Sequence, residues 1–121
     1  MAAKITFDTV LKIAASLPGI QEGTTYGVDA LKVGGKLLTC PAINKSAEPN
    51  SAMFRIDVDQ RNALIEEAPD IYYITDHYVN YPCVLVRLSR VNADALRDLL
   101  QTAFRFVSAK DRGKSRGRSR K

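Results

Sequence analysis

The sequence predicts a two-layer α+β domain in which three helices pack on one face of an antiparallel sheet. Three segments have apolar residues at helical spacing, and the stretches between them alternate apolar and polar residues as strands do. A Gly-Gly pair joins two of these stretches, which is typical of a hairpin and therefore of antiparallel pairing. Because each helix has one apolar face, the helices are expected to cover one side of the sheet. The 121 residues are the length of one domain.

The first and last helices are the most clearly marked. We expect the first over residues 6–17, where the hydroxyl of Thr6 caps the start. Pro18 ends this helix because it cannot donate the next backbone hydrogen bond. Asn92 is the expected cap of the last helix. The apolar stripe of the last helix consists of Leu96, Leu99, Leu100, Ala103 and Val107.

The middle of the chain is predicted to consist mostly of strands. The glycines of the hairpin are Gly34 and Gly35, because a two-residue turn needs positive φ angles at its centre. A short helix over residues 60–68 is expected to begin at Asp59 as its cap and to end at Pro69. The expected strands are residues 24–27, 31–33, 36–40, 52–58, 71–74 and 83–88.

The basic charge is concentrated at the C-terminal end of the chain. Residues 108–121 carry seven Lys and Arg residues and one Asp, a net charge of +6, whereas the remaining residues carry a net charge of −1. The same segment has almost no apolar side chains, so it cannot bury enough surface to offset the entropy of ordering it. We therefore expect a folded domain over residues 4–108 and a disordered tail over residues 109–121.

The tail is the one feature whose charge alone predicts a partner. A flexible run of cations attracts the phosphates of DNA or RNA without reading their sequence, and such binding weakens as salt rises. A tail that only increases solubility and binds nothing in particular is the alternative. The residues predicted to contact phosphates are Lys110, Arg112, Lys114, Arg116, Arg118 and Arg120.

The solvated face of the predicted sheet is a second candidate for binding. One interpretation of its basic residues is a set of weak cross-strand ion pairs with acidic neighbours such as Glu22 and Asp57. The other is a surface that contacts nucleic-acid phosphates or a ligand. The basic residues expected on this face are Lys32, Lys36, Arg55 and Arg87. The further side chains expected at its edge are Tyr26, His77 and Tyr78.

Tyrosines are also concentrated in this part of the chain. Tyr72, Tyr73, Tyr78 and Tyr81 lie within ten residues. Aromatic rings beside cations can stack on the bases of single-stranded nucleic acid. They can equally fill a core and place their hydroxyls in water. Because side chains alternate along a strand, Tyr72 and Tyr73 are expected to face opposite sides and cannot form one stacking platform.

The sequence predicts no catalytic residue, no metal and no cofactor. His77 follows Asp76 and could act as a general base, but no Ser or Cys in a nucleophile motif accompanies it, so a structural histidine is predicted. Cys40 and Cys83 lie in separate apolar stretches, as buried thiols of a reducing compartment do, and they lack the paired spacing of zinc ligands. Lys36 follows the glycine pair without the spacing of a phosphate-binding loop.

An ordered set of short segments is spread over most of the range of residues 4–107. They are Ser16-Leu17-Pro18-Gly19 with Glu22, Tyr26-Gly27, Lys32-Val33-Gly34-Gly35-Lys36, Pro69-Asp70-Ile71-Tyr72-Tyr73-Ile74-Thr75, His77-Tyr78, Leu85-Val86-Arg87-Leu88, and the pattern from Leu99-Leu100 to Ala103-Phe104. Together these segments resemble the MmcQ/YjbR family of small bacterial proteins. No single segment is specific, but the ordered set is.

This resemblance implies a fold like that of CyaY and frataxin, a sheet with helices packed on one face. It also implies a DNA-binding role through a double-wing arrangement, and it carries over no catalytic residues. The chain departs from the family pattern, because many members have Trp near the positions of Pro82-Cys83 and Phe104 and this chain has no Trp. A role that depends on an indole ring at these positions is therefore in doubt.

We expect a non-enzymatic protein that binds nucleic acid weakly and without sequence specificity. The alternative is a domain that binds a protein or a small ligand through the exposed sheet face, and a concave site there would favour it. An enzyme with His77 or Cys83 at its centre is the third possibility. The chain has no apolar run of about 20 residues, no visible signal peptide and no surplus apolar helix face, so a cytoplasmic monomer is expected.

Overall fold

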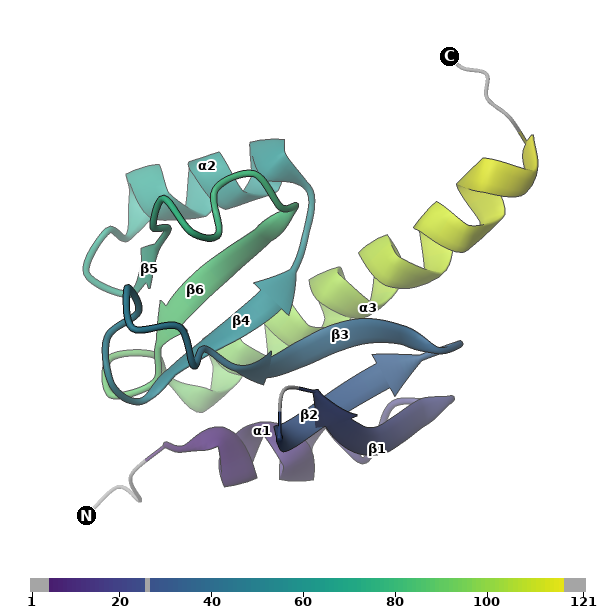
Figure 1. The fold of residues 1–121 in the computed structure, drawn as a ribbon, viewed down its shortest axis with the longest axis horizontal. Coiled ribbons are helices and arrows are strands. Elements are labelled where there is room, and N and C mark those ends of the chain that lie inside the picture. The colour runs from purple at the N-terminus through teal and green to yellow at the C-terminus, as the bar shows by residue number, and fades with distance from the viewer. Residues whose placement is uncertain (1–4, 26, 117–121) are drawn as a thin grey trace.

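The structure is a computed structural model that describes residues 5–25 and 27–116, and the side chains of residues 25 and 109–116 lie outside the description. Within these residues, one sheet has the strand order β1-β2-β3-β4-β6-β5, and every neighbouring pair is antiparallel (Figure 1). The strands are β1 Ile20–Thr25, β2 Val28–Val33, β3 Lys36–Pro41, β4 Ser51–Arg55, β5 Tyr72–Tyr73 and β6 Cys83–Arg87. The helices are α1 Phe7–Ala14, α2 Val58–Glu67 and α3 Ala93–Arg116.

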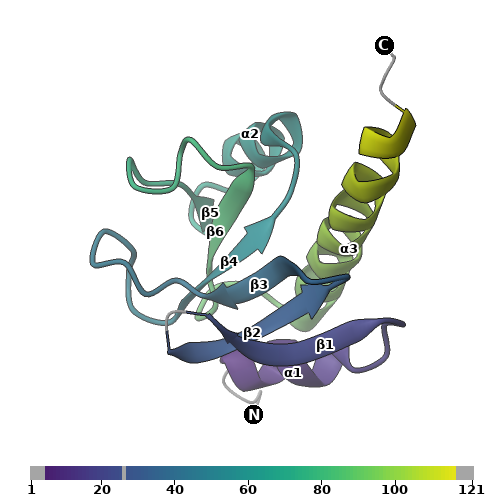
Figure 2. The same ribbon diagram turned by 45° about the vertical axis from the view of Figure 1, so that its right-hand side comes forward.

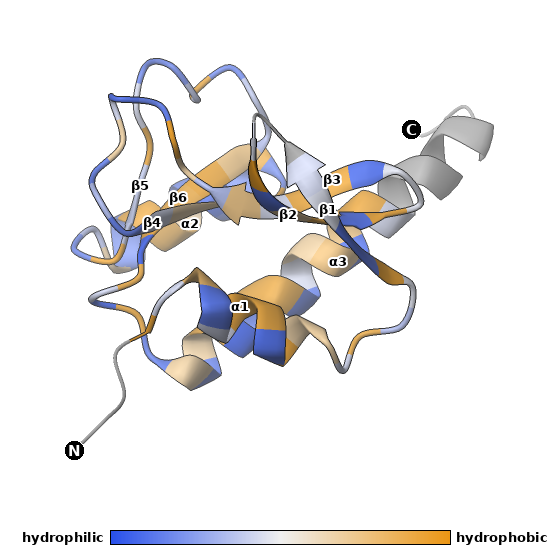
Figure 3. Ribbon diagram, turned by 60° about the horizontal axis from the view of Figure 1, so that its bottom comes forward, coloured by the Kyte–Doolittle hydropathy of each residue, from blue (hydrophilic) through white to orange (hydrophobic). Residues whose placement is uncertain are grey.

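The helices lie on one side of the sheet. α3 contacts β2, β3, β4 and α1, and α2 contacts β5 and β6 at the other end of the sheet (Figures 1 and 2). Leu64 and Ile65 of α2 pack against the same core as α1 and α3 do. Figure 3 shows bands of apolar and polar residues along α1 and α3, the pattern of helices that bury one face. The α+β fold predicted from the sequence is confirmed.

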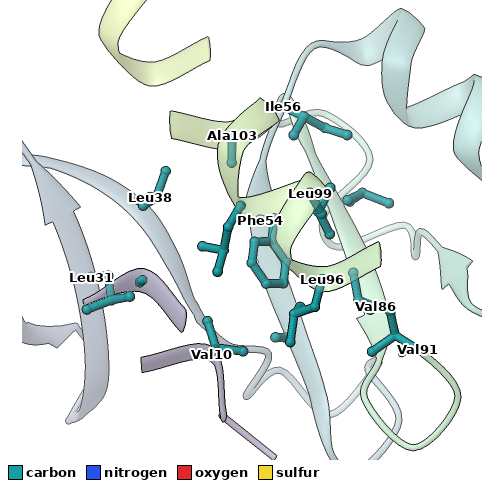
Figure 4. Close-up of a cluster of buried hydrophobic side chains, with 14 of the residues drawn as sticks. Val10, Leu31, Leu38, Phe54, Ile56, Val86, Val91, Leu96, Leu99 and Ala103 are labelled. Atoms are coloured by element: carbon teal, nitrogen blue, oxygen red, sulfur yellow. The ribbon is translucent and has the colours of Figure 1, made fainter. Parts of the chain in front are cut away.

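The main core lies between the sheet and the helices. Phe54 of β4 has no exposed surface and lies among Leu38 and Val86 of the neighbouring strands β3 and β6 and Leu96 and Leu99 of α3 (Figure 4). Both strand and helix residues therefore surround this ring, as expected where a two-layer domain buries its apolar faces. Phe54 is the largest of the fully buried side chains.

The predicted hairpin at the glycine pair is confirmed. Gly34 and Gly35 have φ angles of 58° and 81°, and positive φ at both central positions is the geometry of a two-residue turn that suits twisted strands. Val33 and Lys36 flank the turn and lie opposite each other in the register of β2 and β3.

The start of α2 differs from its prediction by two residues. Asp57, and not Asp59, is the cap, because its carboxylate accepts the backbone N–H of Asp59 at 2.9 Å. The strand expected over residues 52–58 therefore ends earlier, at Arg55. Asn92 does cap α3 as predicted, since its side-chain oxygen accepts the N–H of Ala95 at 2.8 Å.

The N-terminal elements also differ in their bounds. α1 begins after Thr6, as predicted, but it ends at Ala14, and residues 15–17 form turns. β1 is longer than the strand expected over residues 24–27, although its sequence does not alternate clearly. Pairing with β2 along its whole length satisfies the backbone groups that face β2, so tertiary pairing outweighs the weak local pattern.

α3 extends beyond the expected end of the folded domain. The backbone is helical through Arg116, and the predicted division into a folded domain over residues 4–108 and a disordered tail over residues 109–121 stays a prediction. A packed helix can propagate into such a segment, because each further residue adds a backbone hydrogen bond and cations favour a helix C-terminus. Among the described helices, none combines the length and the apolar character needed to cross a membrane.

Candidate ligand-binding site

The face of the sheet opposite the helices carries a second apolar cluster. Its buried residues are contributed by β2, β3, β4 and β6, and they are Ala30, Cys40, Met53, Cys83 and Leu85. The register places Cys40 and Leu85 on either side of Met53. The segments on this side are two loops, residues 42–50 between β3 and β4 and residues 74–82 between β5 and β6, which lie away from α3 in Figure 2. The two loops therefore cover part of this second face of the sheet and leave the rest of it open to solvent.

Hydrogen bonds tie the two loops to each other. The backbone N–H of Asn44 donates to the hydroxyl of Tyr78 at 3.3 Å, and the hydroxyls of Ser46 and Thr75 lie 2.8 Å apart. The hydroxyl of Tyr73 also accepts the backbone N–H of Glu48 at 2.8 Å. The loops therefore form one connected wall above the sheet.

Arg61 holds the second loop in place from α2. Its side chain is 5% exposed, and Nη1 donates to the carbonyl oxygens of Val79, Tyr81 and Cys83 at 3.2, 3.2 and 3.4 Å. Arg61 is not among the site residues predicted from the sequence. The sequence does contain an indication that Arg61 is buried. Arg61 precedes Leu64 by three positions and so belongs to the same, buried face of the helix.

A cavity of about 750 Å³ lies between the loops and the second face of the sheet. Ile43 and Tyr81, which are 49% and 58% exposed, belong to its lining and mark its opening to solvent. Two of the lining residues, Lys45 and Arg55, are cationic, and none of the described lining residues is Asp or Glu. The full lining consists of Leu37, Cys40, Pro41, Ile43, Asn44, Lys45, Met53, Arg55, His77, Tyr78, Tyr81 and Cys83.

Arg55 is the unusual residue of this lining. It ends β4 directly opposite Cys83 of β6, two residues after Met53, so it lies on the same face as the apolar cluster. Its Nε is buried, and within the described residues it donates to no acceptor. A buried guanidinium nitrogen without an acceptor costs free energy, so this position favours an acceptor supplied from outside the chain.

The structure brings together three of the residues predicted for the sheet face. Arg55, His77 and Tyr78 all line the cavity. Lys32 lies opposite Leu37, which packs on the second cluster, so Lys32 belongs to the same face but does not line the cavity.

The placement expected for Lys36 is wrong. Lys36 lies opposite Val33, whose side chain packs against the main core, so Lys36 belongs to the side that the helices cover. The physical reason is the two-residue turn, which puts the residues on either side of it on the same face. Two parts of the predicted site lie outside the description, so the structure does not place their side chains. They are Tyr26 and the tail residues Lys110, Arg112, Lys114, Arg116, Arg118 and Arg120.

Arg87 is engaged outside the cavity. Its Nε and Nη2 donate to the two carboxylate oxygens of Glu48, each at 2.8 Å, and its guanidinium lies 4.3 Å from the centre of the Tyr73 ring. The hydrogen bonds from Arg87 lower the pKa of the Glu48 carboxyl. Arg87 therefore supports the interpretation that the basic residues of this face form ion pairs with acidic neighbours. Its partner is Glu48 of the first loop, and not Glu22 or Asp57.

The tyrosines divide between the two faces. Tyr72 packs in the main core, whereas Tyr73 and Tyr78 pack against the second cluster, which confirms that Tyr72 and Tyr73 face opposite sides. The hydroxyls of Tyr73 and Tyr78 accept backbone N–H groups of the first loop. Two of the four clustered tyrosines therefore position the wall of the cavity, and Tyr81 forms part of its opening.

The two thiols of the site are buried, and its histidine is exposed. Burial raises the pKa of both Cys40 and Cys83 to about 11, so both are protonated at neutral pH and are weak nucleophiles. The two thiols lie on β3 and β6 with β4 between them, too far apart for a disulfide. His77 is exposed, and its ring meets the ring of Tyr78 edge-on with centroids 4.8 Å apart. In the described part of the chain, no group of three or more His, Cys, Asp or Glu residues is placed to hold a metal ion.

A smaller cavity of about 320 Å³ lies between α2 and α3 and has a different character. Glu67, Tyr72 and Asp98 belong to its lining. Burial raises the pKa of the Tyr72 hydroxyl, and the two carboxylates add to the effect. Within the described residues, this cavity has no buried polar group without a partner, so the larger cavity is the stronger candidate.

Comparison with known proteins places the chain among small bacterial proteins of the same size. Two proteins described as uncharacterized, from Mycobacterium tuberculosis and Mycobacterium bovis, are each 29% identical to it in an alignment that covers 87% of this chain and 90% of theirs. The crystal structure of a Deinococcus radiodurans protein with the domain DUF419 has a TM-score of 0.73 at 21% identity and covers 89% of this chain and 82% of its own. The family model YjbR matches residues 15–106. The chain therefore belongs to the YjbR family, as the sequence segments indicated.

Proposed function

We propose that this YjbR-family protein binds a small organic ligand in the cavity between the two loops and the second face of the sheet. The observation that carries the proposal is the cavity itself, whose volume of about 750 Å³ lies within the usual range of ligand sites. Such sites combine an apolar lining with a few polar groups that orient the ligand. Met53 and Leu37 supply the first kind of contact here, and Arg55, His77 and Asn44 supply the second.

The proposal is one of binding without catalysis. The raised pKa of both cysteine thiols supports it, because the thiolate is the reactive form and is scarce at neutral pH. Among the described residues, no hydrogen bond orients the ring of His77, which an effective general base would need. The cytoplasmic location and the monomeric state stay predictions, and light scattering tests the second.

Filling the cavity is expected to abolish ligand binding. Binding is first detected by screening a mixed library of neutral and charged fragments for chemical-shift changes in the backbone amides of β3, β4 and residues 74–82. Replacing Cys40, a buried residue of the cavity lining, by Phe places a ring in the cavity and should weaken any hit more than tenfold, about 1.4 kcal/mol.

The control for this experiment is Cys40→Val, which changes the same side chain with little added volume. It should retain the fold and most of the affinity, since Val and Cys are close in size and both are apolar. A screen without hits in the cavity, or hits that Cys40→Phe leaves unchanged, contradicts the proposal.

Weak binding of nucleic acid is a second candidate function. The observation that favours it is the net charge of +6 on residues 108–121, which attracts phosphates whatever their sequence. The contacts are proposed for Lys110, Arg112, Lys114, Arg116, Arg118 and Arg120, with the strand residues Lys32, Arg55 and Arg87 in second place.

Fluorescence anisotropy of labelled duplex and single-stranded DNA tests this second candidate. The full chain is compared with a chain that ends at Ser108. The full chain should bind with a logarithmic salt slope of at most about −6, because seven cations are available, and the shortened chain should lose that binding. Equal affinity of the two chains would show that the tail is not the site, and a lack of binding at low salt would reject nucleic acid altogether.

A further inference from the structure

We propose that the ligand is an organic anion whose charged group binds Arg55 and whose apolar body lies against Met53 and its neighbours. This inference rests on the proposed function, because it names the chemical class of ligand for the same cavity. Four kinds of observation carry it: the hydrogen-bond partners of the arginines, the charges of the lining, the apolar floor, and the position of the opening.

Arg55 differs from the other arginines that the fold engages. Arg61 donates to three carbonyl oxygens, and Arg87 donates to both oxygens of Glu48. The Nε of Arg55 is buried but donates to no acceptor of the described chain. Because the guanidinium keeps its charge at all relevant pH values, an acceptor with negative charge is the partner that suits it best.

The charges around Arg55 reinforce this preference. Lys45 is the second cation of the lining, and no Asp or Glu occurs among the described residues that line the cavity. Attraction to an anion is stronger in a site with apolar walls than in water, because the local dielectric constant is lower. A cationic ligand would be repelled by both side chains.

The remaining surface of the cavity suits an apolar body. Met53, Cys40 and Cys83 belong to the buried cluster at its floor, and Leu37 and Tyr78 pack against that cluster. A ligand with only charged groups would leave this floor without apolar contact. A neutral apolar ligand would leave Arg55 without an acceptor. The ligand that satisfies both is a carboxylate, sulfonate or phosphate ester with an aromatic or aliphatic body.

The opening limits the ligand to a small molecule. Ile43 and Tyr81 lie on the two loops and belong to the lining, and the hydrogen bonds between Asn44 and Tyr78 and between Ser46 and Thr75 connect the same loops. An anionic polymer such as nucleic acid would contact this rim without filling the apolar floor. The cavity therefore favours a single compact anion.

Two fluorescent probes with the same ring system test the inference. 8-Anilinonaphthalene-1-sulfonate carries one anionic group, and N-phenyl-1-naphthylamine is the same skeleton without it. The full chain should bind the sulfonate roughly ten- to a hundredfold more tightly than the neutral amine, the range that one charge-assisted hydrogen-bonding group contributes. The Nε–H resonance of Arg55 should shift only with the sulfonate.

Substitution of Arg55 assigns the preference to this side chain. Arg55→Met should weaken the sulfonate roughly ten- to a hundredfold and leave the neutral amine unchanged. Arg55→Lys, which keeps the charge without the planar fork, should retain part of the affinity. Lys32→Met is the matched control, because it removes one positive charge from the same sheet face outside the cavity lining, and it should change neither probe.

The outcomes separate the ligand class from the proposed function. Equal binding of both probes, or sulfonate binding that Arg55→Met leaves unchanged, overturns the anionic class while the cavity remains a binding site. Failure of both probes to bind the folded wild-type chain counts against the site as a whole. If Arg55→Met does not fold, the comparison of the two probes on the wild-type chain still decides the question.

Discussion

Replacement of Phe54 by Ala should lower the free energy of unfolding by about 3–5 kcal/mol, the usual cost of deleting a buried aromatic ring. Phe54 has no exposed surface, and strands and α3 surround its ring, so the structure has little room to close the space left behind (Figure 4). Urea unfolding monitored by circular dichroism measures the change. A loss below about 1 kcal/mol would contradict the packing of α3 on β4.

Met53 supplies the matched control on the other face of the same strand. Met53 is 7% exposed and lines the cavity, so one side of its side chain already lacks packing partners. Met53→Ala should therefore cost no more than about 2 kcal/mol, the lower end for buried methionine. Equal losses for Phe54→Ala and Met53→Ala would mean that the second face is as tightly packed as the first.

Replacement of Arg61 by Met should lower the free energy of unfolding by about 2–4 kcal/mol, because it removes three hydrogen bonds from a charged donor in a largely buried place. The affected carbonyls belong to Val79, Tyr81 and Cys83, two of which line the cavity. The loop of residues 74–82 should become more open, and its amides should exchange hydrogen faster than those of α3.

Arg97→Met is the control for the loss of a cation. Arg97 is half exposed and contacts Asp94 at 2.9 Å on the surface of α3. Its removal should change the free energy of unfolding by no more than about 0.5 kcal/mol, as is usual for exposed ion pairs. If Arg61→Met has an equally small effect, the three hydrogen bonds to the loop do not stabilise the site.

These two results bear on function through the cavity wall. The first loop is held by Tyr73 and Tyr78, and the second is held by Arg61, so the wall depends on side chains from three separate elements. Loss of Arg61 should weaken binding of both fluorescent probes, whereas loss of Arg55 should weaken only the anionic one. The Arg61 substitution therefore tests whether the loop must be held in place for binding, and the Arg55 substitution tests whether the site prefers anions.

The sequence by itself determined the fold class, because the relevant signals are local. Glycines at positive φ specify the hairpin at residues 34–35, and Asn92 and the spacing of apolar residues specify α3. Alternation along one strand was enough to place Tyr72 and Tyr73 on opposite faces. The family resemblance also came from short segments in order along the chain.

The site was only partly visible in the sequence. The predicted group contained Arg55, His77 and Tyr78, which line the cavity, but it also contained Lys36, which belongs to the other side of the sheet, and it lacked Arg61. Periodicity assigns a residue to a face of its own element. It does not say which faces of two paired strands lie on the same side of the sheet. The two-residue turn places Lys36 opposite Val33 and therefore on the side that the helices cover.

Only the tertiary structure decided that the second face of the sheet is hollow. Loops separated by about thirty residues meet there because Tyr78 reaches Asn44 and Thr75 reaches Ser46. Whether a cation at the end of a strand has a partner likewise depends on contacts between distant segments. Arg55 and Arg87 both end a strand, but Arg87 donates to Glu48, whereas the buried Nε of Arg55 has no acceptor among the described residues. Local propensity determines which elements form, and long-range packing determines which polar groups remain to bind a ligand.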